Sequence, residues 1–190
     1  MSAASSGSDD EVLAEGRCAG GALLLRRPAP LRDAAMHALL NDAATMLPHL
    51  SMLCPISAED SAARRERHRA EAAEGTSCML DVVASETGEL IGSTGFRVVD
   101  RSASSAEWGI IVGNAWQRKG VCGECFARCL GVAAGALGVQ NVTASTLADN
   151  DPMLAFFARH GLPQTGVHSD ESGTEWLVFS APLADLVSGL

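Results

Sequence analysis

The stretch IIVGNAWQRKGVCGECF, residues 110–126, decides how the rest of the chain is interpreted. An apolar run ends at Gly113, a polar turn follows at residues 117–120, and an apolar helical pattern begins directly after it. The N–H groups at the start of a helix have no intrahelical acceptor and lie at the positive end of the helix dipole, so they form an anion site. Gly120 has no Cβ to hold an anion away from the backbone, and Lys119 is the only lysine in the chain. The stretch therefore predicts a strand, an anion-binding turn and a helix, in that order.

The same stretch contains a C-x-x-C pair, Cys122 and Cys125, which is typical of redox and metal sites. Together with Cys129 these residues fall at i, i+3 and i+7, the inner stripe of one helix, where cysteine packs as a small apolar residue. A structural zinc site needs a fourth ligand, and the next histidine along the chain is His160. We therefore expect no metal. A thiol at a helix start is often reactive, so a thiol-redox or metal protein using this pair stays an alternative.

Length and composition indicate one domain without a nucleic-acid or membrane partner. The chain has 190 residues, of which 47% are hydrophobic, and a formal net charge of −9, which disfavours nucleic acid. We expect a disordered leader at residues 1–20, a single domain at 21–182 and a short tail at 183–190. No apolar run reaches the roughly 18 residues of a membrane span, and the N-terminus does not resemble a signal peptide. A cytoplasmic protein with reduced cysteines is expected.

Hydrophobic periodicity divides the chain after residue 20 into strands and helices. Strands are predicted at 21–28, in two runs within 77–100 around a turn at 86–89, and at 104–113, 140–148, 162–169 and 174–182. Helices are predicted at 29–50, 57–75, 120–137 and 151–161. The order β-α-α-β-β-β-α-β-α-β-β predicts a mixed α/β (α+β) fold, in which about four helices flank a mostly antiparallel sheet of about six or seven strands.

In this context the turn Q117-R-K-G120-V-C122 resembles the Q/R-x-x-G-x-G/A acyl-CoA loop of the Gcn5-related N-acetyltransferases. The resemblance covers about residues 22 to 181, and it rests on the order and spacing of several segments. These are GELIGSTGFR at 88–97, AEWGIIV at 106–112, KGVCGE at 119–124 and ADNDPMLAFFARHGL at 148–162. The opening strand and helix, at 23–46, resemble the subgroup that acetylates ribosomal-protein N-termini and polyamines.

The resemblance implies an enzyme that moves an acetyl group from acetyl-CoA to a primary amine by direct transfer in a ternary complex. The acceptor classes are small-molecule amines, amino acids, polyamines and peptide N-termini, and a homodimer is among the assemblies considered. Acetyl-CoA is the implied cosubstrate. The implied CoA-binding residues are Ile110, Ile111, Val112, Gln117, Arg118, Lys119, Gly120, Val121, Cys122, Gly123, Asn150 and Phe157. His49 and Cys54 fall in the region where the family shapes its acceptor site.

Glu107 is the candidate general base, because transfer to an amine requires an unprotonated nucleophile. Strand alternation places Glu107, Gly109 and Ile111 on one face, and a bulge is predicted at residues 111–113. Asn150 is also a good N-cap for the helix that follows it. Phe157 and Met153 stand where relatives often place a tyrosine or serine proton donor, and the chain has no tyrosine. A non-catalytic acyl-CoA-binding or sensor domain is therefore an alternative.

The helix predicted at 57–75 begins with a capping pattern from Ser57 to Asp60 and then alternates glutamates with arginines. This composition predicts a largely solvated helix whose surface carries salt bridges. A role for its arginines in binding the acceptor is a further alternative.

Overall fold

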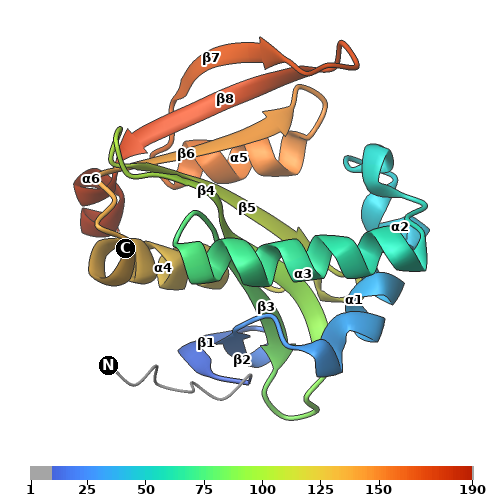
Figure 1. Ribbon diagram of the computed structural model, residues 1–190. Helices are drawn as coiled ribbons and strands as arrows, with labels where there is room; N and C mark the ends of the chain where they lie inside the picture. Colours follow the sequence, from blue (N-terminus) through green and yellow to red (C-terminus); the bar gives the residue numbers. More distant parts are fainter. Residues whose placement is uncertain (1–9, 190) are drawn as a thin grey trace.

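The computed structural model of the chain describes residues 10–189, apart from the side chains of Met52 and Ala136. One eight-stranded sheet has the order β1-β2-β3-β4-β5-β6-β8-β7, and Figure 1 shows β1 and β2 at one end of it and β7 and β8 at the other. Neighbouring strands are antiparallel except β5 and β6, which are parallel. The strands are β1 Val12–Cys18, β2 Gly21–Arg26, β3 Cys78–Ala84, β4 Leu90–Asp100, β5 Ser105–Val112, β6 Asn141–Leu147, β7 Gln164–Ser169 and β8 Glu175–Pro182. The mixed, mostly antiparallel fold predicted from the sequence is confirmed.

Helices cover both faces of the sheet. They are α1 Asp33–Leu40, α2 Ala43–Met46, α3 Ala58–Glu74, α4 Val121–Val132, α5 Asp151–Arg159 and α6 Leu183–Ser188. The apolar sides of α4, α5 and α6 share one core with Trp108 and Ile110 of β5. Those of α1 and α2 form a second core with Ile111 on the opposite face, where α3 also lies. None of the helices in the described residues is long and apolar enough to span a membrane.

The predicted leader and the strand count need correction. Residues 12–18 form β1, so the sheet has eight strands rather than six or seven; the first nine residues of the leader lie outside the described residues. β1 lies at an edge of the sheet and only part of each side chain is buried, so its sequence lacks a strong apolar pattern. Backbone pairing with β2 holds β1 in place. Ion pairs just before β1 add to this: Asp10 pairs with Arg26 and Arg32, and Glu11 pairs with Arg27.

Six helices are present in the described residues rather than about four. The first predicted helix, 29–50, is interrupted at residues 41–42 and becomes α1 and α2. The predicted tail forms α6, because Leu183 and Leu186 pack into the core beside α4. The predictions of the 86–89 turn, the helix start at Val121 and the final hairpin are confirmed.

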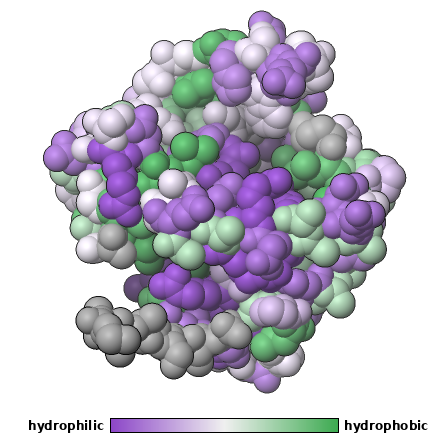
Figure 2. All heavy atoms as spheres, viewed as in Figure 1, coloured by the Kyte–Doolittle hydropathy of each residue, from purple (hydrophilic) through white to green (hydrophobic). Residues whose placement is uncertain are grey.

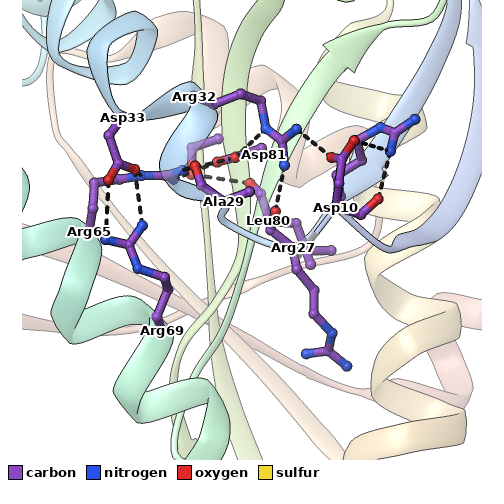
Figure 3. A network of polar contacts seen from close by, with 11 residues as sticks. Asp10, Arg27, Ala29, Arg32, Asp33, Arg65, Arg69, Leu80 and Asp81 are labelled. Atoms are coloured by element: carbon purple, nitrogen blue, oxygen red, sulfur yellow. Dashed lines mark hydrogen bonds and ion pairs between the residues drawn. The ribbon is translucent and has the colours of Figure 1, made fainter. Parts of the chain in front are cut away.

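The arginine-rich helix α3 is largely solvated, but one of its arginines joins a buried network. Asp81 on β3 is fully buried, and it accepts hydrogen bonds from Arg32 Nε at 2.8 Å and from Arg65 Nη1 at 2.5 Å (Figure 3). Arg65 also donates from Nε to Asp33 Oδ1 at 2.7 Å, and Arg69 donates to the same carboxylate. A buried carboxylate requires such partners. Only Ser61, Arg65 and His68 of α3 are buried, so the predictions of a largely solvated, salt-bridged helix and of the Ser57 to Asp60 cap are confirmed; what the sequence did not predict is the buried contact of Arg65 with Asp81.

The splay between β5 and β6 is the feature that positions the site. The two parallel strands pair at Ser105 to Glu107 opposite Asn141 to Thr143, and within the described chain they do not pair further along. β5 continues to Val112, paired with β4 on its other edge. The predicted bulge at residues 111–113 is wrong: the register with β4 is continuous there, and it shifts at Arg97 instead. Separation of two parallel strands, rather than a bulge, therefore frees the edge of β5.

Candidate functional site

A cleft of about 700 Å³ opens where β5 and β6 separate. Its walls are the second half of β5, the loop that leads into α4, the end of β6, α5 and the segment between α2 and the following turn. Residues predicted to bind CoA that line it are Ile110, Ile111, Val112, Gln117, Arg118, Gly120, Val121, Cys122, Gly123, Asn150 and Phe157. His49, predicted at the acceptor site, also lines the cleft. The structure thus brings together residues that lie more than a hundred positions apart.

The loop before α4 has the backbone of an anion site. Gly120 is the N-cap of α4 with φ +82°, and it has no side chain to occupy the helix start. Arg118 also has a positive φ of 58°, and Gln117 Nε2 donates to Val112 O at 3.0 Å, which ties the loop to the end of β5. The first N–H groups of α4 are free of intrahelical acceptors and face this opening. The loop thus has a glycine with positive φ at the helix start, and its binding of an anion stays a prediction.

The N-terminal hairpin supports this loop from behind. A Cβ on Gly120 would lie 3.4 Å from Cβ of Cys18, and one on Gly20 would lie 3.0 Å from the ring of Trp116. Lys119 is not part of the cleft wall: its Nζ lies 4.9 Å from the centroid of the Trp116 ring. The lysine therefore reaches the loop from its outer side, where its charge still contributes to the local positive potential.

The cysteines of α4 are embedded rather than reactive. Cys125 and Cys129 are buried in the core, and Cys122 is half-buried in the cleft wall. Burial raises the pKa of Cys122 to about 12, so this thiol stays protonated at neutral pH. In residues 10–189 no three His, Cys, Asp or Glu side chains form a group that could hold a metal ion. A dithiol or metal role thus receives no support from the geometry.

Glu107, the predicted base, does not line the cleft. Its carboxylate accepts a hydrogen bond from Arg97, and its side chain is 26% exposed on the face of β5 that carries Gly109 and Ile111. Both of those neighbours do line the cleft, so Glu107 lies next to its wall on the side of α3. Cys54 does not line it either, because it packs against the apolar core of α1 and α2.

His49, unlike Glu107 and Cys54, lines the cleft. The buried Nδ1 of its ring has no hydrogen-bond partner in the described residues, and Asp149 Oδ1 lies 4.0 Å from it. The opposite wall is formed by α5, where Asn150 is the N-cap: its side chain accepts from Met153 N at 3.4 Å and donates to Thr146 Oγ1 at 2.9 Å. Asn150 therefore fixes the start of α5 and shapes the wall.

Several aromatic residues that were not predicted from the sequence line the cleft. Trp116 and Trp176 come from a loop and from the start of β8, and no spacing in the sequence connects them with the motif. Trp108 packs between α4 and α5, with its ring 4.8 Å from Phe126 and 5.8 Å from Phe156. His160 stacks on Phe156, and burial followed by the charge of Arg159 lowers the pKa of this histidine. The apolar walls suit a long, flexible ligand arm.

Comparison with known proteins identifies the class. Residues 22–163 match the family described as the Acetyltransferase (GNAT) domain, whereas no curated protein matches the sequence. The chain therefore belongs to the GNAT acetyltransferase family. It is an acyl-CoA-dependent N-acetyltransferase with acetyl-CoA as its cosubstrate.

Solved structures share the fold at low identity. RimL, described as a ribosomal L7/L12 alpha-N-protein acetyltransferase in its apo form, has a TM-score of 0.77 and 16% identity, with 91% of this chain and 94% of that chain covered. RimJ of Mycobacterium smegmatis in complex with CoA-disulfide has a TM-score of 0.74 and 19% identity, with 92% of each chain covered. The Microcin C7 self immunity acetyltransferase MccE, in complex with acetyl-CoA and AMP, has a TM-score of 0.71 and 16% identity, with 84% and 92% covered. The fold is thus shared with RimJ and RimL, as the predicted resemblance implied.

Proposed function

We propose that the chain transfers the acetyl group of acetyl-CoA directly to a primary amine inside a ternary complex. The acceptors considered are small-molecule amines, amino acids, polyamines and peptide N-termini. One observation carries the proposal: a single cleft contains both the start of α4, which suits a pyrophosphate, and the unpaired edge of β5, which suits a thioester. We further propose a cytoplasmic protein without a nucleic-acid partner, supported by its charge of −9, and a homodimer as the assembly to test first.

The loop and the start of α4 would hold the CoA pyrophosphate. Gln117, Arg118 and the N–H groups of residues 120–123 supply donors and charge, with Lys119 behind them. The loop before α4 requires glycine at position 120. Its φ of +82° is strained for any residue with a side chain, and an added Cβ would contact Cys18. Cys122, where the family has Gly or Ala, adds a protonated thiol to the wall.

The edge of β5 would bind the pantetheine arm and orient the thioester. Backbone groups of residues 110–112 line the cleft and are not paired with β6. An N–H of this edge can donate to the thioester carbonyl oxygen as negative charge develops on it during attack by the amine. Asn150 and Phe157 would form the facing wall.

Two side chains are candidates for the general base. Glu107 lies two residues from Gly109 on the same face of β5, on the α3 side, so it would take the amine proton through a water molecule. His49 is the second candidate, because it lines the cleft and its buried Nδ1 faces Asp149.

The test is thiol release from acetyl-CoA, measured over the four acceptor classes at several pH values. We expect amine-dependent release by the wild type and a fall of roughly a hundredfold in kcat/KM when the base is removed. Glu107→Gln and His49→Gln are compared in parallel, since each keeps size and polarity similar. Full turnover of Glu107→Gln at every pH excludes Glu107, and a loss confined to His49→Gln assigns the role to His49. Release that does not depend on an amine would contradict N-acetyl transfer.

A further inference from the structure

Arg64 on α3 is a half-buried cation that lacks an anionic partner. Within residues 10–189 it makes no hydrogen bond and no ion pair, whereas its helix neighbours Arg65, Arg67 and Arg69 are each paired with an acid. Burial, followed by the charges of Arg67 and Arg97, lowers the pKa of Arg64. Of the nearby acids only Glu71 raises the pKa of Arg64, and a partly desolvated guanidinium without a direct ion pair becomes more favourable when an anion binds beside it.

The position of Arg64 connects it to the cleft. It lines a small hollow beneath α3 together with Ser93 and Ile111, and Ile111 also lines the cleft. Arg97 runs across Gly109, a second residue of the cleft wall, with its Nε 3.1 Å from where a Cβ on that glycine would be. The two arginines therefore lie directly behind the wall that β5 presents to the cleft.

This side of β5 is opposite to the side that holds the predicted pyrophosphate site. Ile110 packs into the core of α4 and α5, whereas Ile111 packs into the core of α1 and α2. Figure 2 shows hydrophilic residues gathered over α3 across the middle of the outer face. Because the start of α4 already supplies the donors for the CoA phosphates, an anion at Arg64 belongs to a different ligand.

We infer that Arg64, supported by Arg97, forms a subsite for an anionic group of the amine acceptor. The inference rests on the proposed transfer to an amine and narrows its acceptor class. A guanidinium presents paired donors that match a carboxylate or a phosphate. The unpaired charge of Arg64 repels a polyamine, so the residue selects by repulsion as well as by attraction. The favoured acceptors are amino acids or peptide N-termini that carry an acidic group near the amine.

The test compares three dipeptides with the same terminal amine, Ala-Glu, Ala-Gln and Ala-Lys, in wild type and variants. We expect kcat/KM for Ala-Glu to exceed that for Ala-Gln by about tenfold or more, with Ala-Lys lowest. Arg64→Gln should abolish this order, so that Ala-Glu and Ala-Gln are acetylated with similar kcat/KM. Arg64→Lys keeps the charge and should keep part of the preference. Arg67→Gln is the matched control, because Arg67 lies on the same helix but pairs with Glu71 at 3.8 Å outside the hollow.

A binding measurement decides the inference when no dipeptide is acetylated. With CoA saturating, Ala-Glu should raise the Tm of the wild type and of Arg67→Gln more than Ala-Lys does, and Arg64→Gln should remove that difference. Equal effects of the two peptides on the wild type, or an unchanged preference in Arg64→Gln, would overturn the anionic subsite. Absence of thiol release with every amine, together with a retained binding preference, would instead reject the proposed transfer and keep the subsite.

Discussion

Glu124 and Arg17 join the N-terminal strand to the start of α4: the backbone N of Arg17 donates to Glu124 Oε1 at 3.1 Å. The same carboxylate oxygen accepts from Arg128 Nε at 2.8 Å, so it is held from both sides. The GNAT family model matches residues 22–163, so β1 lies outside the matched region. A segment that the sequence assigned to a leader is thereby in contact with the helix that we propose binds CoA.

Substitution of Gly16 tests this contact. A Cβ at Gly16 would lie 2.5 Å from Cγ of Glu124, so Gly16→Val should displace β1 from α4. We expect the free energy of unfolding to fall by about 1–3 kcal/mol and acetyl-CoA affinity to weaken, because Cys18 and Gly20 contact the loop. Gly166→Val is the control, since a Cβ there has no neighbour within 4 Å. Urea unfolding and calorimetric titration measure both effects; identical behaviour of the two variants would refute the role of β1.

A comparison of alanine substitutions at Gly120 and Gly138 distinguishes the effect of backbone strain on stability from the loss of acetyl-CoA binding. Gly120→Ala and Gly138→Ala both place alanine at a positive φ, +82° and +63°, and each should cost about 1–2 kcal/mol of stability. Only Gly120 belongs to the cleft wall, so strain from alanine there should displace the loop and weaken acetyl-CoA binding, whereas Gly138→Ala should leave binding unchanged. The dissociation constants of the two variants check this. Equal affinities would show that the loop does not bind the pyrophosphate.

The buried carboxylate of Asp81 should be essential for stability. Asp81→Asn leaves Arg32 and Arg65 without their shared charge, which should cost about 3–5 kcal/mol. Glu71→Gln, which breaks the exposed pair with Arg67, should cost less than about 1 kcal/mol. Denaturant unfolding of both variants gives the comparison. A cost for Asp81→Asn as small as that for Glu71→Gln would mean that the network in Figure 3 contributes little.

The lowered pKa of His68 should make the free energy of unfolding depend on pH. Burial, and then the charges of Arg64 and Arg65, lower the pKa of His68 from 6.5 to about 4. Between these values the unfolded chain binds a proton that the folded protein does not, so the free energy of unfolding should fall as pH decreases from about 6.5 to about 4. His68→Gln should flatten this part of the profile. An unchanged slope in the variant would show that other groups cause the dependence.

Cys122 should react slowly and be protected by the cosubstrate. Its pKa of about 12 leaves little thiolate at neutral pH, so iodoacetamide should modify it more slowly than a free thiol. Because Cys122 lines the cleft, saturating acetyl-CoA should slow the reaction further. Peptide mass spectrometry after timed alkylation measures both rates. Fast modification that acetyl-CoA does not affect would revive a redox role and place the cosubstrate elsewhere.

Sequence patterns predicted the elements whose apolar spacing is regular. The stripe of Cys125 and Cys129 defines α4, and the Asn150 cap with Pro152 defines the start of α5. β1 was missed because an edge strand needs backbone partners more than apolar side chains. The loop before α4 was identified from the sequence, because a polar turn with a glycine directly before a helix is a signal contained in one short segment.

The rest of the site depends on contacts between distant segments. Nothing local to Arg65 indicates that Asp81 lies beneath it, so the sequence gives no reason to distinguish Arg65 from Arg64 on the same helix. The same limit applies to Glu107, whose pairing with Arg97 depends on the register of β4 and β5. Neither Trp176 nor His49 carries a motif, and the folded chain alone brings them to one cleft.

The most direct test of the central claim is amine-dependent release of CoA from acetyl-CoA, with the acetylated amine identified by mass spectrometry. We expect equimolar CoA and N-acetylated product with the wild type and with Gly138→Ala, and a strongly reduced rate with Gly120→Ala at the same acetyl-CoA concentration. Failure of the wild type to bind acetyl-CoA, or hydrolysis of the thioester without any acetylated amine, would contradict it.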